Sequence, residues 1–312
     1  MQPPDLRGVT VATILPFDND LEIDWESYAR VLDYCATPEG IAAVFVNGHA
    51  GEGGLLSEKE RDEVIRRTRS HIGSKPLLAG VIANSTAQAI AEARLAQKAG
   101  ADCAVLFPPS ALGQGAAMNA RAPVAYVRSV AEAIDIPVSI FQYPVPSGLG
   151  FTTDTLAEMA AIPGVIAIKE GSDVVQLYED NWRAVKKANP ELAFLPSNYN
   201  WFLPQLAIGA DGILSGLVSL VPHLFVRLWD ATAAADLQQL RALNDELHPI
   251  VRTIYGSAPL IDMHTRIKVG LQAMGIIRSA LPRPPLMAIE PGIQEKIRQA
   301  VNAAREAGTI VR

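Results

Sequence analysis

The sequence is poor in several features that mark particular protein classes. It holds only two cysteines, Cys35 and Cys103, and both stand in apolar surroundings without metal-ligand spacing. We interpret them as small core residues in a reducing compartment. Charge of neither sign dominates, with 27 Lys and Arg against 33 Asp and Glu, and no basic stripe or arginine-rich run occurs. This charge pattern argues against nucleic acid as a partner.

Long hydrophobic runs and targeting signals are also missing. No apolar run approaches the ~20 residues that span a bilayer. Residues 1–5 lack the charged and apolar regions of a signal peptide. We therefore expect a soluble, cytoplasmic protein without a membrane partner.

The residue patterns of metal sites and of common nucleophilic triads are absent as well. The histidines are scattered, and no Ser-His-Asp set can be proposed from their spacing: His49, His71, His223, His248 and His264. No zinc or divalent-metal spacing is evident, so we predict no metal site. A Gly-x-Gly-x-x-Gly turn is missing after the first predicted strand, which argues against a dinucleotide-binding fold.

A recurring pattern, in contrast, runs through most of the 312 residues, of which 49% are hydrophobic. A helix-like segment ends in small residues, and a short aliphatic run follows. The runs begin at Gly40, Gly100, Gly164 and Gly209. Glycine relieves left-handed strain where a helix ends. A short run that is apolar on both faces is typical of a parallel strand covered by helices.

Four further candidate strands complete a set of eight by about residue 215. They are Gly8–Leu15, Pro76–Ile82, Pro137–Gln142 and Leu192–Leu195. Predicted helices over residues 58–71, 87–99 and 173–188 lie between strands, and a capping box of Ser57 and Glu60 begins the first. Ser172 is a candidate N-cap for the predicted helix over residues 173–188. Eight alternations of strand and helix predict an α/β fold, the (β/α)8 TIM barrel.

The last part of the chain carries more helices than a barrel needs. Apolar residues at helical spacing occupy residues 237–255, 260–274 and 289–307. We predict a barrel core over residues 1–221, followed by the closing helix and a C-terminal helical region over 222–312. This extension would pack on the barrel or on a neighbouring subunit.

Candidate site residues follow from the rule that barrel enzymes place chemistry after the C-terminal ends of their strands. After the second strand, residues 47–54 contain four glycines around His49 and Glu52. Such a loop can turn its N–H groups toward a carboxylate or phosphate, and the alternative is a flexible connection. After the eighth strand, Ser215 and Gly216 would leave space at the barrel mouth.

Two further strand ends carry residues suited to carbonyl chemistry. Lys169 ends the aliphatic run 165–168, and it is the only lysine at a predicted strand end. Burial would lower the pKa of this lysine and free a nucleophilic amine. Tyr143 follows the fifth strand and could relay a proton. The alternative for Lys169 is an ordinary strand-end charge paired with Glu170, and the alternative for Tyr143 is a rim tyrosine. A lysine nucleophile beside a tyrosine fits a Schiff base with a carbonyl substrate and requires no cofactor.

The order of these motifs resembles the dihydrodipicolinate synthase / N-acetylneuraminate lyase family. The motifs are Gly48-x-x-Gly51-Glu52, Tyr143-x-x-Pro146, Ile168-Lys169-Glu170 and Gly209-Ala210-Asp211-Gly212-Ile213. The opening residues 8–17 fit as well, so the resemblance covers nearly the whole chain. It implies a (β/α)8 barrel with a C-terminal helical region, assembly into tetramers or dimers, and class I aldolase-type chemistry on pyruvate or another 2-oxo acid.

The resemblance also implies roles for individual residues. Lys169 matches the Schiff-base lysine, and Tyr143 matches the tyrosine that relays protons and orients the keto acid. The loop that binds the carboxylate of the 2-oxo acid matches Gly48, His49, Ala50 and Gly51, with Glu52 at its end.

Three departures separate this chain from the synthases of the family. His49 and Ala50 replace two threonines, and no tyrosine stands near Pro109-Ser110. Gly148 stands where the synthases carry an arginine for the carboxylate of the aldehyde, a contact worth ~1.5–3 kcal/mol. We therefore expect a divergent member rather than a true dihydrodipicolinate synthase. Its substrate would be less anionic near Gly148 and Leu149.

The sequence therefore predicts a lyase in which Lys169 forms an imine with a 2-oxo acid and Tyr143 shuttles protons. The same imine supports C–C bond cleavage, C–C bond formation and dehydration, so the sequence does not distinguish these reactions. An aldehyde is a candidate second substrate. His49 is either a relay in place of the missing threonine or a loop residue without a catalytic part. The alternative to an enzyme is a non-catalytic 2-oxo acid-binding or regulatory barrel that keeps the pocket.

Overall fold

Eight parallel strands form the centre of the molecule. The computed structural model describes residues 3–197 and 200–311. Residues 1 and 2, which belong to the segment searched for a signal peptide, lie outside this range. The strands are β1 (Gly8–Ala12), β2 (Ile41–Val46), β3 (Leu77–Val81), β4 (Cys103–Leu106), β5 (Val138–Gln142), β6 (Val165–Glu170), β7 (Ala193–Pro196) and β8 (Gly212–Ser215). They are hydrogen-bonded in the order β7-β6-β5-β4-β3-β2-β1-β8, so sequence neighbours are also sheet neighbours.

Two hydrogen bonds join the first and last strands of that order. The backbone N–H of Asp211 donates to the carbonyl of Phe194 at 3.0 Å. The N–H of Phe194 donates to the Asp211 carboxylate at 2.8 Å. These bonds bring the start of β8 against β7 and close the sheet into a barrel. The prediction of a (β/α)8 TIM barrel is confirmed.

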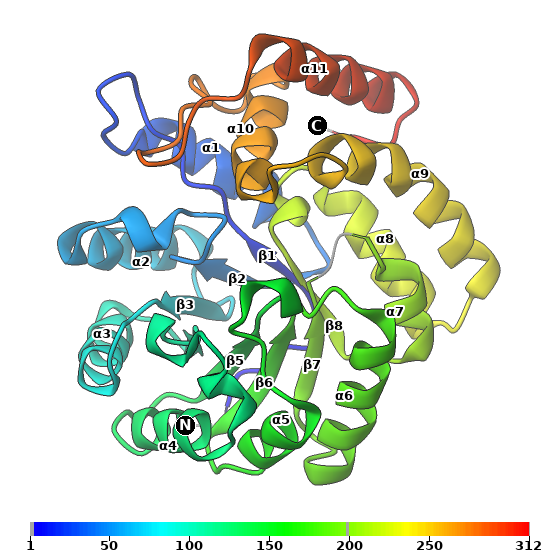
Figure 1. Cartoon of the computed structure of the whole chain (residues 1–312). Coiled ribbons are helices and arrows are strands. Elements are labelled where there is room, and N and C mark those ends of the chain that lie inside the picture. Colours follow the sequence, from blue (N-terminus) through cyan, green and yellow to red (C-terminus); the bar gives the residue numbers. More distant parts are fainter. Residues whose placement is uncertain (1–2, 198–199, 312) are drawn as a thin grey trace.

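Helices surround the barrel, as Figure 1 shows. They are α1 (Trp25–Cys35), α2 (Glu58–Ile72), α3 (Thr86–Ala99), α4 (Arg121–Ala131), α5 (Thr153–Ala160), α6 (Val175–Ala188), α7 (Phe202–Ile208), α8 (Pro222–Ala233), α9 (Leu237–Tyr255), α10 (Met263–Ala273) and α11 (Pro291–Glu306). Helices α9, α10 and α11 gather on one side of the barrel, next to α1 and α8 (Figure 1). The division into residues 1–221 and 222–312 stays a prediction.

The local signals for helix ends were partly right. The capping box at the start of α2 is present, because the Ser57 hydroxyl accepts from the Glu60 N–H and the Glu60 carboxylate accepts from the Ser57 N–H. Ser172, in contrast, does not cap α6. That helix begins three residues later, at Val175, without a side-chain cap. The Ser172 N–H instead donates to the carboxylate of Glu170 at 3.3 Å.

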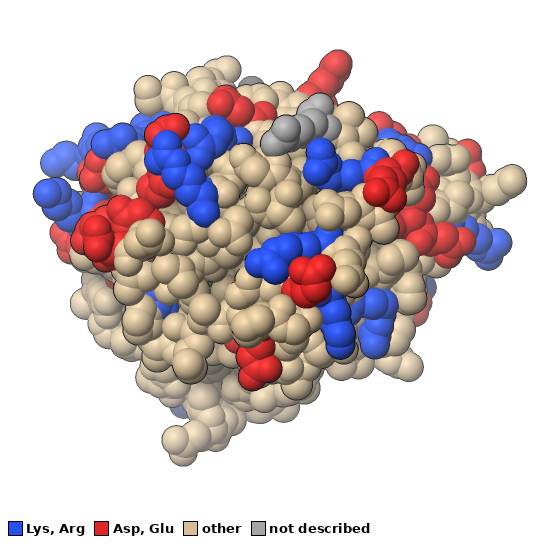
Figure 2. Space-filling model, turned by 90° about the horizontal axis from the view of Figure 1, so that it is seen from above, with Lys and Arg blue, Asp and Glu red and all other residues tan. Residues whose placement is uncertain are grey.

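The strands are buried on both faces, as their aliphatic composition predicts. Every residue of β1, β3, β4 and β5 is buried. No helix in the described parts of the chain is long and apolar enough to cross a membrane. On the face shown in Figure 2, basic and acidic side chains lie interspersed, without a continuous patch of one sign.

The capping box of α2 yields a test of local stability. Replacing Ser57 with alanine leaves the N–H of Glu60 without its cap, so we expect a loss of about 1 kcal/mol in the free energy of unfolding. Urea unfolding followed by circular dichroism measures this loss. The control is Ser70→Ala, an exposed serine within the same helix, which should change the unfolding midpoint little. Equal effects of the two substitutions would contradict the assignment.

Candidate active site

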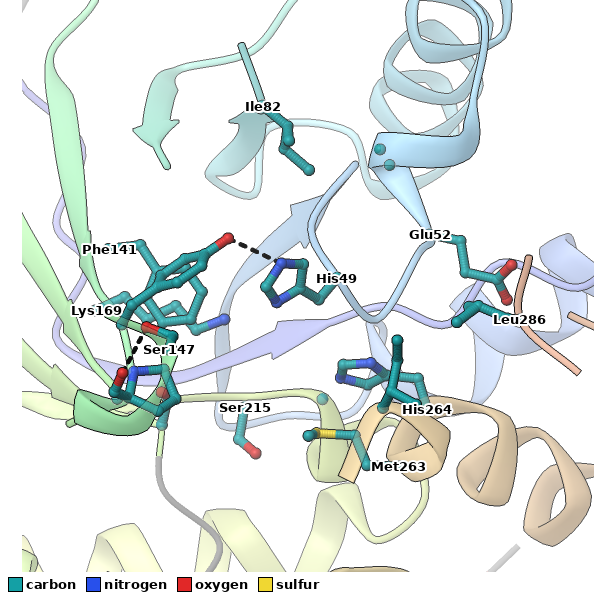
Figure 3. Close-up of a pocket in the computed structure, with 18 of the residues that line it drawn as sticks. His49, Glu52, Ile82, Phe141, Ser147, Lys169, Ser215, Met263, His264 and Leu286 are labelled. Carbon is teal, nitrogen blue, oxygen red and sulfur yellow. Dashed lines mark hydrogen bonds between the residues drawn. The ribbon is translucent and has the colours of Figure 1, made fainter. Parts of the chain in front are cut away.

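A cavity of about 530 Å3 opens where the C-terminal ends of the strands meet (Figure 3). Its wall combines residues from β5, β6 and β8, from the loops after β2 and β3, and from the C-terminal helical region. The volume lies within the range of about 300–1,000 Å3 that is typical of small-molecule sites.

Lys169 lies in this cavity with its amine surrounded by aromatic rings. Its side chain points inward from β6, and the residue is 7% exposed. The Nζ atom lies 4.1 Å from the ring centroid of Phe141 and 5.3 Å from that of Phe45. Within residues 3–197 and 200–311 it has no ion-pair partner. Burial therefore lowers the pKa of Lys169 to about 7, so a large share of the amine is neutral near neutral pH.

Glu170 does not pair with Lys169, because successive side chains of a strand point to opposite faces. Its carboxylate is buried on the outer face of the barrel. There it accepts hydrogen bonds from the Ser172 N–H at 3.3 Å and from the Asn181 amide at 3.2 Å. Burial raises the pKa of Glu170 to about 7. The alternative of an ordinary strand-end charge paired with Glu170 is therefore wrong.

Tyr143 and His49 form a hydrogen-bonded pair in the cavity that Lys169 also lines, and the dashed line at His49 in Figure 3 marks this bond. The Tyr143 hydroxyl lies 2.9 Å from Nε2 of His49. The His49 ring projects into the cavity and makes edge contacts with Phe107 and Phe141. Burial in this aromatic surround and the nearby Lys169 amine lower the pKa of His49, which favours the neutral imidazole. Burial raises the pKa of Tyr143, so its hydroxyl keeps its proton.

The glycine-rich loop after β2 is compact. The N–H of Gly53 donates to the Gly48 carbonyl at 2.9 Å, and Glu52 adopts a left-handed backbone with φ 53°. A Cβ on Gly53 would lie 2.0 Å from the Asn47 carbonyl oxygen, so only glycine fits there. In the described part of the chain, the N–H groups of Ala50 and Gly51 donate to no acceptor. They remain available for an anion.

The carboxylate of Glu52 fixes this loop to the C-terminal region. It accepts hydrogen bonds from the buried Lys268 amine of α10 and, at 2.8 Å, from the N–H of Arg283. Lys268 also donates to the Leu281 carbonyl at 3.1 Å. Both oxygens of Glu52 are thus engaged, and we assign it an anchoring role. No local motif indicated this pair, because 216 residues separate its members.

The residues predicted for the site fall into two groups. The cavity wall includes Lys169, Tyr143, His49 and Ser215. Outside the wall lie Gly48, Ala50, Gly51 and Gly148. The Ser215 hydroxyl accepts from the N–H of Leu217 at 3.2 Å, so it caps the turn after β8. Gly148 is exposed, and it ends a short 3-10 turn with φ 71°.

The C-terminal region supplies wall residues that the sequence analysis missed. Met263 and His264 reach the cavity from the start of α10, and Leu286 reaches it from the segment after that helix. The ring centroids of His264 and His49 lie 6.5 Å apart. These two histidines, which are far apart in the sequence, therefore lie close together in the structure. Burial is the main cause that lowers the pKa of His264. No group of acidic, histidine or cysteine side chains suited to a metal occurs among the described residues.

Comparisons with known proteins agree with this architecture. A sequence model of the dihydrodipicolinate synthetase family matches residues 5–304. The 4-hydroxy-tetrahydrodipicolinate synthase of Archaeoglobus fulgidus is 26% identical over 297 residues, which are 95% of this chain and 98% of the relative. An uncharacterized DapA-like lyase of Halobacterium salinarum is 31% identical over 253 residues, 80% of this chain and 79% of the relative. The structure of dihydrodipicolinate synthase from Thermotoga maritima matches in fold, with a TM-score of 0.89 and 24% identity over 97% of this chain and 99% of that one.

The unpaired amine yields a test through the pH dependence of stability. Between about pH 7.5 and pH 10, the unfolded chain binds a proton at Lys169 that the folded protein does not, so stability rises with pH in this window. We expect Lys169→Met to be more stable than the wild type near pH 7.5. The difference between the two proteins in the free energy of unfolding should shrink by up to about 1.4 kcal/mol per pH unit as pH rises.

Urea unfolding midpoints across this pH range measure the difference. The control is Lys187→Met on the exposed surface of α6, where no burial penalty exists. A constant difference between Lys169→Met and the wild type at every pH would contradict a buried, neutralised amine.

Proposed function

This chain is a lyase that belongs to the dihydrodipicolinate synthetase family, and from that premise we propose that it acts on pyruvate or another 2-oxo acid through an imine on Lys169. The observation that carries the proposal is the buried amine at the end of β6, which has no counter-ion among the described residues. Its lowered pKa supplies the neutral nucleophile that attack on a ketone requires.

The proposed reaction begins at the keto carbon. The Nζ atom of Lys169 bonds to that carbon. The carbonyl oxygen takes up one proton from Nζ and one from Tyr143, and it leaves as water. The resulting iminium draws electrons from the adjacent carbon, which supports cleavage or formation of a C–C bond or loss of water. Tyr143 is the proton donor to the departing oxygen, since its hydroxyl stays protonated and it lines the same cavity as Lys169. The neutral His49 ring returns a proton to Tyr143 from Nε2 through the 2.9 Å hydrogen bond as it takes one up from solvent at Nδ1.

The carboxylate of the 2-oxo acid has a candidate site on the loop after β2. The N–H groups of Ala50 and Gly51 lack acceptors among the described residues, and adjacent backbone amides in a tight turn are suited to an anion. Small residues stand across the mouth: a Cβ on Gly216 would lie 3.3 Å from both Ala50 and His264. Glycine at this position therefore keeps space between the loop and α10.

We also propose that the chain is a divergent member rather than a true dihydrodipicolinate synthase. No arginine lines the cavity within the described residues, and Gly148 lies outside its wall. The alternative of a non-catalytic binding barrel is set aside, because relatives that match nearly the whole chain are synthases. Assembly into tetramers or dimers stays a prediction.

Borohydride trapping tests the imine directly. With pyruvate and borohydride, we expect the protein to gain the mass of one reduced pyruvate, and peptide mapping should place it on Lys169. Lys169→Arg should gain nothing, because arginine cannot form the imine. The matched control Lys187→Arg, on the exposed face of α6, should be trapped as the wild type is. No adduct, or an adduct at another lysine, would refute the mechanism.

Removal of one hydroxyl tests the proton relay. Tyr143→Phe keeps the ring contact with Phe141 and removes the hydrogen bond to His49. We expect the rate of imine formation to fall by about 10²–10⁴-fold, while the urea midpoint changes little. Tyr34→Phe is the control, since its hydroxyl bonds the Leu220 carbonyl at 2.8 Å and does not line the cavity. An unchanged rate in Tyr143→Phe would exclude the relay.

A further inference from the structure

We propose that the part of the substrate beyond the 2-oxo acid is uncharged and apolar, an aryl or alkyl group delivered as an apolar aldehyde or released as one. This inference rests on the proposed function, because Lys169 defines which end of the cavity holds the keto acid. Three properties of the rest of the cavity support it: its size, its lining and the positions of its charges.

The size of the cavity exceeds the needs of a three-carbon acid. Its volume of about 530 Å3 is that of a site for a drug-sized molecule. Lys169, Tyr143 and His49 occupy one side (Figure 3). The space on the other sides extends past Ile82 and toward Leu286 and α10, so a second reacting group has room next to the imine.

The lining of that extra space is mostly hydrophobic. It comes from four separate segments: Leu55 after β2, Ile82 after β3, Met263 of α10 and Leu286 beyond α10. Ile261, which also lines the cavity, is 64% exposed, so the apolar surface continues outward at the mouth. Burial of this apolar surface against an apolar group of the substrate is favourable by about 25 cal/mol per Å2.

The charges near the cavity leave no partner for a distal carboxylate. Of the described wall residues, Lys169 and Glu52 are those with an ammonium or carboxylate group, and Lys169 is committed to the imine. Burial lowers the pKa of His49 and of His264, which favours neutral rings. Both carboxylate oxygens of Glu52 are engaged by Lys268 and by the Arg283 N–H. The Arg283 guanidinium is turned away to Glu60, at 2.6 Å. A carboxylate in the extra space would therefore lose its hydration without gaining a cation.

Two 2-oxo acids of similar length provide the test. 2-Oxo-4-phenylbutanoate carries a distal phenyl group, and 2-oxoadipate carries a distal carboxylate. Each is titrated with borohydride against the full-length protein, and the readout is the adduct on Lys169. We expect the phenyl compound to reach half-maximal trapping at a concentration at least about tenfold lower. Pyruvate is titrated alongside as the reference for the imine itself.

Two neighbouring substitutions make the comparison specific. Leu286→Arg adds a cation at a half-buried wall position, and it should reduce the preference for the phenyl compound by at least about fivefold. Met287→Arg adds the same charge one residue along, where the side chain is 77% exposed and outside the wall, and should leave the preference unchanged.

The outcomes separate the two proposals. If pyruvate is trapped while 2-oxoadipate matches or exceeds the phenyl compound, the inference about the substrate is overturned and the proposed function stands. The same holds if pyruvate is trapped and neither longer acid is. If pyruvate is not trapped on Lys169, the proposed function fails, and this inference fails with it.

Discussion

The site depends on one constraint, the burial of an amine without a counter-ion. The alternation of β6 sends Lys169 inward and Glu170 outward, so adjacent residues of opposite charge are kept apart. Aromatic rings then take the place of water around the amine. An ammonium is poorly solvated there, and the proton is lost more readily. The reactivity that we propose for the amine and its cost to stability therefore have the same origin, as is common at functional sites.

A second arrangement keeps other charges out of the same space. Glu52 belongs to the loop that faces Lys169, yet its carboxylate points to Lys268 and the backbone of Arg283. This buried pair holds the left-handed turn at Glu52 and joins the loop to α10. The cavity wall beside it is left apolar. One ion pair thus shapes the loop, attaches the C-terminal region and engages the carboxylate that would otherwise face the cavity.

Much of the fold was predictable from sequence, because short buried strands and helix starts are local patterns. Lys169, Tyr143, His49 and Ser215 were expected at the barrel mouth and line the cavity there, because parallel strands end at the same edge and strand-end residues converge. His264, Met263 and Leu286 were not, since they approach from a region whose packing on the barrel depends on contacts over long sequence distances. Ser172 was misjudged because α6 begins only at Val175, beyond the reach of its capping position, while the Ser172 N–H donates to the buried Glu170 carboxylate.

The cavity wall is formed by segments that are synthesised at different times. A ribosome releases the barrel strands first, and β8 ends at Ser215. The wall also needs His264 and Leu286, and the loop after β2 needs Lys268 to hold Glu52. A chain that ends after β8 would keep the rings of Phe45 and Phe141 beside the amine of Lys169 but would lack this part of the wall. The cavity wall is therefore completed only after the segments beyond β8 have been synthesised.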